Sequence, residues 1–377
     1  MANRVVNFNA GPSTLPLEVL EIAREEFLDY KGSGMSIIES SHRSPEFDEV
    51  NTTCMALAKE VLGLNDNFKV LFLQGGASMQ FAMIPFNFLN PGQVGAYVDT
   101  GTNDSVPLLL DALQQANLDV ADVDFVFLTH IHLDHAGGAG NLMRELPNAK
   151  CVLHPRGAPH MVNPEKLIKG TEAVYGVERT REMYGQLQPI DEHRVLVVDD
   201  GQWLDLNGRK VQALFTEGHA RHHYCLNDPA SCGVFTGDSF GISYRELDTA
   251  AGEFIFPTST PASFDPVEAH IAVDRIMACE PEQLYLTHYS RVTDVGRLAD
   301  DMHDGITAYE KIALSCSDAP DRSTALRDAM FDYLSRRAMD HGFEGGRDAL
   351  AEIINVDVDL NAAGLVAWLN RLDKGKQ

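Results

Sequence analysis

Residues 129–135 read Thr-His-Ile-His-Leu-Asp-His, and this segment constrains the fold more than any other part of the chain. It follows the apolar, β-prone run Val123–Leu128 and precedes a Gly137-Gly138 pair that is typical of a tight turn. Imidazole nitrogen and carboxylate oxygen are the atoms that borderline divalent cations prefer as ligands. The segment therefore predicts a metal site on a loop at the end of a buried strand.

Three later runs of strand character each end on a further candidate ligand. These runs and the residues that follow them are Val211–Thr216 with His219, Gly233–Thr236 with Asp238, and Leu284–Thr287 with His288. A glycine directly before His219 and before Asp238 lets the backbone turn sharply there. Each run taken alone is equally well explained as an ordinary turn. Their shared pattern after the first cluster favours one common metal centre.

Together these motifs resemble the metallo-β-lactamase superfamily of hydrolases, over about residues 95–300. The resemblance implies an α/β fold, the αββα sandwich of that superfamily, and two metal ions. The ligands that it implies are His130, His132 and His219 for the first ion, Asp134, His135 and His288 for the second, and Asp238 as the bridge. It also implies that Asp99 and His223 orient these ligands by hydrogen bonds without binding metal.

The implied ligand set indicates hydrolysis. Two cations about 3.5–4 Å apart lower the pKa of a bridging water and supply a hydroxide nucleophile near neutral pH. Asp134 and Asp238 are the expected catalytic residues, because their carboxylates can also guide a proton towards the leaving group. We expect two divalent cations, with zinc first and iron or manganese as alternatives. The expected substrate is a small-molecule ester, thioester or lactone.

Residues 1 to about 100 resemble a different family. The strings Asn7–Pro12, Gly34–Arg43 and Leu71–Ser78 are similar to the first quarter of phosphoserine aminotransferase, a pyridoxal-phosphate enzyme. The positions that bind phosphate groups in that family correspond here to His42, Arg43, Ala77 and Ser78. The Schiff-base lysine of that family lies beyond the point where this chain departs from it. We therefore expect these residues to be remnants, without bound pyridoxal phosphate; an aminotransferase-related role is the less favoured alternative.

We expect three parts in the chain: an aminotransferase-like fragment over 1–83, a metallo-β-lactamase-fold domain over 84–300, and a helical C-terminal extension over 301–377. Residues 84–101 include a strand, turn and strand pattern, which predicts a hairpin that replaces the first strands of the superfamily fold. If the replacement is inadequate, the alternative is a metal-binding fusion without catalysis. The aromatic-rich insertion 241–265 predicts either a wall of the substrate pocket or a packed surface loop.

Composition restricts the partners and the location. The net charge of −25 argues against a nucleic-acid partner. The six cysteines lie scattered without a C-x-x-C pair, which suits a reducing compartment. The first residues lack the apolar stretch of a signal peptide, and no run approaches the length of a membrane span. We expect a cytoplasmic protein without membrane contact that acts on a small molecule, and a homo-oligomer is compatible with this interpretation.

Overall fold

The chain divides into two compact units, Met1–Gln74 and Gly75–Gln377. The residues that the computed structural model describes are 15–39, 44–61, 65, 95–115, 118–259 and 263–375. The predicted domain boundary at 83/84 lies outside the described residues, as does the predicted hairpin up to residue 94.

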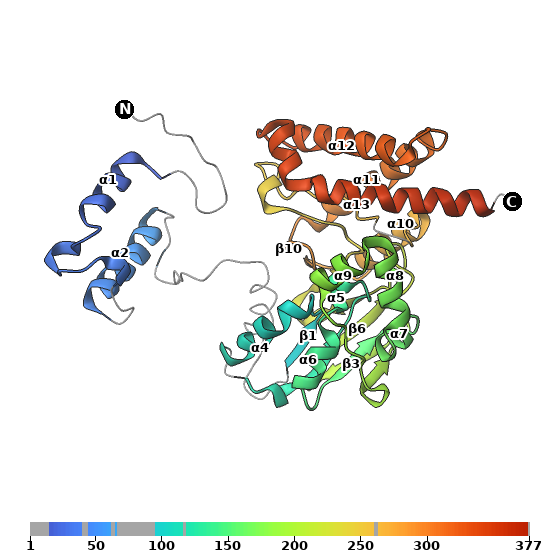
Figure 1. Ribbon diagram of the computed structural model, residues 1–377, viewed down its shortest axis with the longest axis horizontal. Coiled ribbons are helices and arrows are strands. Elements are labelled where there is room, and N and C mark those ends of the chain that lie inside the picture. The colour runs from blue at the N-terminus through green and yellow to red at the C-terminus, as the bar shows by residue number, and fades with distance from the viewer. Residues whose placement is uncertain are drawn as a thin grey trace. The chain divides into compact units, whose positions relative to one another are not determined.

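The described part of the first unit is helical, with α1 (Leu17–Glu25) and α2 (Pro45–Val61) drawn in blue in Figure 1. Both helices expose apolar side chains: Ile22 on α1 is 57% exposed, and Val61 on α2 is 82% exposed. A helix in a protein obtains most of its stability from burying an apolar face. These two helices bury little of theirs.

The second unit contains two β-sheets. The first is parallel, with the strand order β1 (Gly95–Val98), β2 (Val123–Phe127), β3 (Lys150–Leu153) and β4 (Val195–Val197). The second has the order β10-β9-β8-β7-β6-β5; its strands are β5 (Trp203–Leu206), β6 (Arg209–Phe215), β7 (Tyr224–Asp228), β8 (Gly233–Gly237), β9 (Gln283–Leu286) and β10 (Ser290–Val292). Its neighbouring strands are antiparallel except for β8 and β9, which run parallel.

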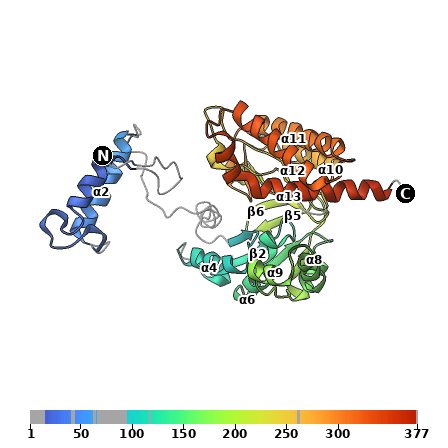
Figure 2. The same cartoon turned by 45° about the horizontal axis from the view of Figure 1, so that its top comes forward.

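Helices cover the outer face of each sheet, as Figures 1 and 2 show. Those associated with the first sheet are α4 (Val106–Gln115), α5 (Leu133–Ala136), α6 (Ala139–Glu145), α7 (Ala158–Val162), α8 (Glu165–Tyr175) and α9 (Val177–Tyr184). Those associated with the second sheet are α10 (Pro266–Met277), α11 (Val295–Ser315), α12 (Arg322–Asp340) and α13 (Gly346–Gly375). Among the described residues, no helix is long and apolar enough to cross a membrane.

Strand β2 contributes side chains to two hydrophobic cores, which explains why its sequence is apolar almost throughout. Successive side chains of a strand point to opposite faces of the sheet. Val126 packs into the core beneath the helices of the first sheet, whereas Phe127 packs into the core between the two sheets. A third core joins the second sheet to α10–α13 and includes Leu286 and Met302. Helix, sheet, sheet and helix layers form an αββα sandwich, which confirms the predicted fold class.

The insertion after β8 is an integral part of that third core. Phe254, Phe256 and Phe264 are buried there beside residues of α11 and α13. Backbone hydrogen bonds between Ile242 and Phe256 close the insertion on itself. These aromatic side chains therefore stabilise the contact with the C-terminal helices, and Trp368 of α13, 7% exposed, packs in the same core.

Candidate metal centre

The seven candidate ligands lie together at one edge of the sandwich, because the strands that carry them end there. His130, His132, Asp134 and His135 follow β2, and the later three follow β6, β8 and β9, namely His219, Asp238 and His288. Residues 133–136 form the short helix α5. The structure thus brings all seven predicted side chains into one site.

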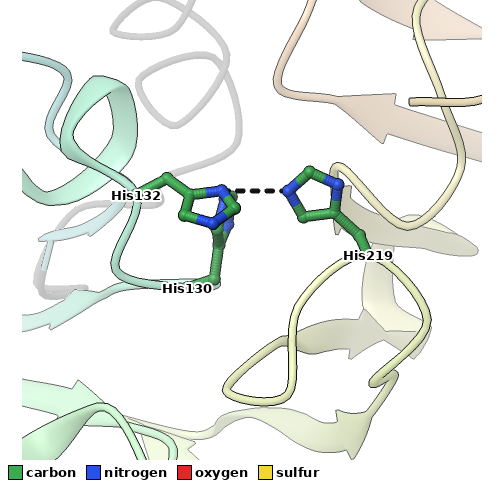
Figure 3. A group of neighbouring side chains, drawn as sticks. All are labelled: His130, His132 and His219. Atoms are coloured by element: carbon green, nitrogen blue, oxygen red, sulfur yellow. Dashed lines mark hydrogen bonds between the residues drawn. The ribbon is translucent and has the colours of Figure 1, made fainter. Parts of the chain in front are cut away.

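Three imidazoles form the first cluster, which we call the three-histidine group: His130, His132 and His219 (Figure 3). Nδ1 of His132 lies 2.9 Å from Nε2 of His130 and 3.0 Å from Nε2 of His219. Burial lowers the pKa of His130 well below its usual range, and the neighbouring imidazoles lower it further. Burial and neighbouring imidazoles lower the pKa of His132 in the same way. These rings are therefore neutral at physiological pH, which is the form that binds metal.

Asp134, His135 and His288 form the second cluster, which we call the mixed group. Oδ2 of Asp134 lies 3.5 Å from Nε2 of His135 and 3.6 Å from Nε2 of His288. Burial alone would lower the pKa of His135, but the carboxylates of Asp238 and Asp134 raise it well above its usual value. Negative potential therefore dominates here, which suits a cation.

Asp238 lies between the two groups. Its Oδ2 is 3.5 Å from Nε2 of His219 in the three-histidine group. Its Oδ1 is 3.2 Å from Nε2 of His135 and 3.5 Å from Nε2 of His288 in the mixed group. Each carboxylate oxygen thus faces a different group, which is the arrangement required of a bridging ligand.

Two buried atoms show that this donor set fits a cation. Nε2 of His135 and Oδ1 of Asp238 form no hydrogen bond with any described residue, although they approach to 3.2 Å. A buried polar atom without a partner costs about 1–3 kcal/mol. A divalent cation satisfies both atoms at once, because imidazole nitrogen and carboxylate oxygen are its preferred donors.

Asp99 supports the mixed group through contacts with His135 and with the threonines that precede two of the ligands. Its Oδ2 lies 2.9 Å from Nδ1 of His135 and accepts a hydrogen bond from the Thr287 hydroxyl at 3.1 Å. Its Oδ1 accepts from the backbone N–H of Thr129 at 2.8 Å. Asp99 has a φ of 60°, in the left-handed region that aspartate adopts more readily than most residues. The Asp99 carboxylate therefore occupies Nδ1 of His135, which leaves Nε2 facing the other members of the site.

His223 supports Asp238 in a similar way. The backbone N–H of Asp238 donates to Nε2 of His223 at 3.1 Å, so this nitrogen is an acceptor. Nδ1 therefore carries the proton and donates to the hydroxyls of Thr216 and Ser239, at 2.8 and 3.0 Å. Both nitrogens of His223 are occupied, which agrees with the expectation that it is not a ligand.

The two glycines that precede ligands serve different purposes. Gly237 has a φ of 49°, so it makes the predicted sharp turn before Asp238. Gly218 lies in a turn at residues 217–219 but does not adopt a left-handed backbone. A Cβ at Gly218 would lie 2.2 Å from the Cα of Ala269, so glycine is required there because α10 packs against the loop.

The threonines before the ligands were not singled out from the sequence. Thr129 holds Asp99 through its hydroxyl and its backbone, Thr287 holds the same carboxylate, and Thr216 holds His223. The signal was present, since all four predicted strand runs or their direct continuations end on threonine. The remnant candidates His42, Arg43, Ala77 and Ser78 lie outside the described residues.

Comparison with known proteins assigns different families to the two ends of the chain. The family model for the metallo-beta-lactamase superfamily matches residues 98–305, more than half of the chain. The model for class-V aminotransferases matches residues 5–134. The two matches overlap over residues 98–134, which include Asp99 and the first histidine cluster.

The aminotransferase likeness is close but short. Phosphoserine aminotransferase of Desulfatibacillum aliphaticivorans is 57% identical over 102 residues, which are 27% of this chain and 28% of that enzyme. That of Campylobacter jejuni subsp. doylei is 59% identical over 98 residues, 26% of this chain and 27% of the enzyme. The chain therefore spans less than a third of the length of these relatives.

The structural likeness concerns the second unit. A metallo-beta-lactamase family protein of Thermus thermophilus matches with a TM-score of 0.51 at 20% identity, over 76% of this chain and 87% of that one. An archaeal superfamily protein of Sulfolobus tokodaii matches with a TM-score of 0.49 at 21% identity, over 73% and 89%. The fold implies divalent metal ions, and the two ligand groups could hold them. The extent of the family match establishes that this chain belongs to the metallo-beta-lactamase superfamily and carries an aminotransferase-like N-terminal region.

Proposed function

We propose that this protein is a dinuclear metal-dependent hydrolase that acts on a small-molecule ester, thioester or lactone. The observation that carries the proposal is the position of Asp238, whose two carboxylate oxygens face two different groups of ligating side chains. Membership of a superfamily of hydrolases supports the reaction class. The substrate class is our own inference from the ligand set.

In this proposal the three-histidine group would hold one cation and the mixed group the other, with Asp238 available as a ligand to both. Two divalent cations bound there, zinc in our proposal, supply Lewis acidity and an activated water for attack on a carbonyl carbon. The protein supplies the geometry. Asp99 fixes the tautomer of His135, and His223 fixes the backbone N–H of Asp238.

Asp134 is the residue that we propose for proton transfer. Its side chain is 49% exposed, whereas that of Asp238 is 5% exposed, so Asp134 is the carboxylate that a substrate can reach. Burial acts to raise the pKa of Asp134, but the attraction and hydrogen bonding of the neighbouring His135 hold it below its usual range. The carboxylate therefore stays ionised at neutral pH, where its oxygens accept a proton and pass it to the leaving group.

The test is metal analysis of the purified full-length protein, followed by a panel of ester, thioester and lactone substrates. We expect about two metal ions per chain and turnover on at least one class. His130→Ala should abolish turnover, because it removes a ligand from the three-histidine group. His193→Ala is the matched control, since His193 is exposed and lies in a short 3₁₀ turn outside both groups.

Two outcomes would contradict the proposal. Two bound metal ions without turnover on any of the three substrate classes would favour a metal-binding fusion without catalysis. Turnover that survives in His130→Ala would place the activity outside this centre. Loss of turnover in His193→Ala as well would show that the histidine substitutions act through folding, and the wild-type turnover with and without a chelator would then test whether the activity needs metal.

A further inference from the structure

A residue of the last helix forms a hydrogen bond with the insertion that follows β8. The hydroxyl of Tyr244 donates to Oδ2 of Asp357 at 2.7 Å, across 113 positions of sequence. Asp357 lies on α13, beyond the residues that match the superfamily. Tyr244 lies six positions after Asp238, on the chain segment that leaves the metal centre.

Tyr244 in turn packs on the residue that follows a candidate ligand. Its ring stacks on that of Tyr289, with 4.2 Å between centroids and 30° between planes. Tyr289 directly follows His288 and has a φ of 80°, and the next residue, Ser290, has a φ of 87°. Non-glycine residues avoid this backbone region, so surrounding contacts must hold these two in it.

Within the described part of the chain, His288 lacks the outer hydrogen bond that supports His130 and His135. Among the described residues, its imidazole contacts the carboxylates of Asp134 and Asp238 and the rings of His135 and Tyr289. By contrast, Nδ1 of His130 is 3.1 Å from the hydroxyl of Thr129, and Nδ1 of His135 is 2.9 Å from Asp99. The direction of the His288 ring is therefore set largely by the segment 287–290.

A plain anchoring role for Asp357 is the competing explanation. The anchor of α13 is already provided four residues further on, where the hydroxyl of Ser259 donates to the backbone oxygen of Asn361 at 2.9 Å. Burial raises the pKa of Asp357, while the Tyr244 hydroxyl and the His288 imidazole both act to lower it. Asp357 is thus close enough to His288 for the two side chains to interact electrostatically. A residue that only anchored α13 at the outer surface would lie too far from His288 for this.

We propose that Asp357 is a positioning residue of the metal centre, which holds Tyr244 against Tyr289 and so fixes the backbone that carries His288. The proposal rests on the proposed metal-binding function. It makes the C-terminal helix a structural part of the mixed group, although α13 supplies no ligand. Groups hydrogen-bonded directly to metal ligands typically change metal affinity by about 10–100-fold when they are removed, and we expect the lower end of that range for Asp357, which acts through Tyr244.

The test is zinc binding to the full-length protein by titration calorimetry, with metal content measured in parallel. The site of the mixed group is identified as the one that disappears in His288→Ala. We expect Asp357→Ala to weaken zinc binding at that site by about 10-fold or more, with the three-histidine site unchanged. Asp357→Asn keeps an acceptor oxygen for the Tyr244 hydroxyl and should restore most of the affinity.

A double-mutant cycle tests whether the two residues act through one contact. Tyr244→Phe should weaken zinc binding at the mixed site as Asp357→Ala does, and the double variant should be no weaker than either single variant. The matched control is Asp359→Ala, which removes a carboxylate two positions along the same helix that pairs with Arg327 of α12 at 2.5 Å. This control should leave both zinc affinities unchanged, and circular dichroism should show that all variants are folded.

The outcomes separate this inference from the proposed function. Fewer than two zinc ions on the wild-type protein would contradict the function itself. Two zinc ions on the wild type, with unchanged affinities in Asp357→Ala, would overturn only the role of Asp357. An equal loss at both sites, or the same loss in Asp359→Ala, would show a general effect of α13 on stability and would also overturn it.

Discussion

The two ligand groups lie side by side at one edge of the sandwich, yet they are held in different ways. The three-histidine group is compact: His130 is fully buried, and its rings come from the loops after β2 and β6. The mixed group is more open, since the side chains of Asp134 and His288 are 49% and 30% exposed. Its supporting contacts come from β1, β9 and, in our proposal, α13.

This difference indicates which of the two ligand groups is more sensitive to substitutions elsewhere in the protein. His130 is buried, and its Nδ1 contacts the hydroxyl of the preceding residue, Thr129. His132 lies two residues further along the same loop and contacts His130. His288 is positioned by contacts that join residues far apart in sequence, such as Tyr244 and Asp357. Substitutions away from the site should therefore affect the mixed group before the three-histidine group.

The largest expected effect is that of Asp99→Ala. The substitution leaves four donors without their acceptor: the N–H and the hydroxyl of Thr129, the hydroxyl of Thr287 and Nδ1 of His135. Because each unsatisfied donor costs about 1–3 kcal/mol, we expect a loss of about 3 kcal/mol or more in the free energy of unfolding. Urea unfolding measures this loss, and zinc titration should show a weakened mixed site.

The control is Asp104→Ala, in the exposed part of the same loop region, which should change stability by less than about 0.5 kcal/mol. An unchanged free energy of unfolding in Asp99→Ala would mean that the hydrogen bonds to the Asp99 carboxylate contribute little. Equal weakening of both zinc sites would remove the distinction between the two groups.

Zinc itself should stabilise the folded state by a smaller amount at each site. Free zinc at about 100 times the dissociation constant raises the free energy of unfolding by about 2.7 kcal/mol per site. His132→Ala should remove the contribution of one group and His288→Ala that of the other, with His193→Ala as the control. Urea unfolding with zinc or with a chelator measures both contributions; full zinc stabilisation in His288→Ala would show that the mixed group binds no cation.

The smallest expected effect is that of Thr287→Val, which removes one hydroxyl from Asp99. A single hydrogen bond of this kind contributes about 1 kcal/mol, and the loss should be accompanied by weaker zinc binding at the mixed site. Thr171→Val is the control, because its hydroxyl donates to the backbone oxygen of Leu167 on α8, away from the centre. Identical zinc affinities in the two variants would contradict the support that we assign to Thr287.

The candidate ligands could be predicted from the sequence because each of them is marked by the residues next to it. A β-prone run followed by a turn places the next polar side chain at the edge of a sheet, so His130, His219, Asp238 and His288 could each be found from a few neighbouring residues. That these strand ends meet at one edge is a property of the tertiary fold, because β2 lies in the first sheet whereas β6, β8 and β9 lie in the second. The αββα layers were implied by the resemblance to the superfamily.

The surrounding contacts could not be predicted in this way. Nothing near Tyr244 or near Asp357 indicates the other, because their hydrogen bond depends on how α13 crosses the insertion. The aromatic residues of that insertion were compatible with a pocket wall or with a surface loop, and Phe254, Phe256 and Phe264 instead fill a core that is shared with the C-terminal helices. Burial of this kind is a property of three-dimensional packing, and composition alone does not reveal it.

The parallel pairing of β8 and β9 has a consequence for how such a protein can diversify. Two parallel neighbours need a long connection, and here the connection runs from Asp238 to His288 through the insertion and α10. Its two ends are fixed by the sheet, whereas the entropic cost of lengthening a flexible loop grows only with the logarithm of its length. New segments can therefore be accepted at low cost in the exposed parts of this connection, so the two candidate ligands can keep their positions while the surface beside them changes.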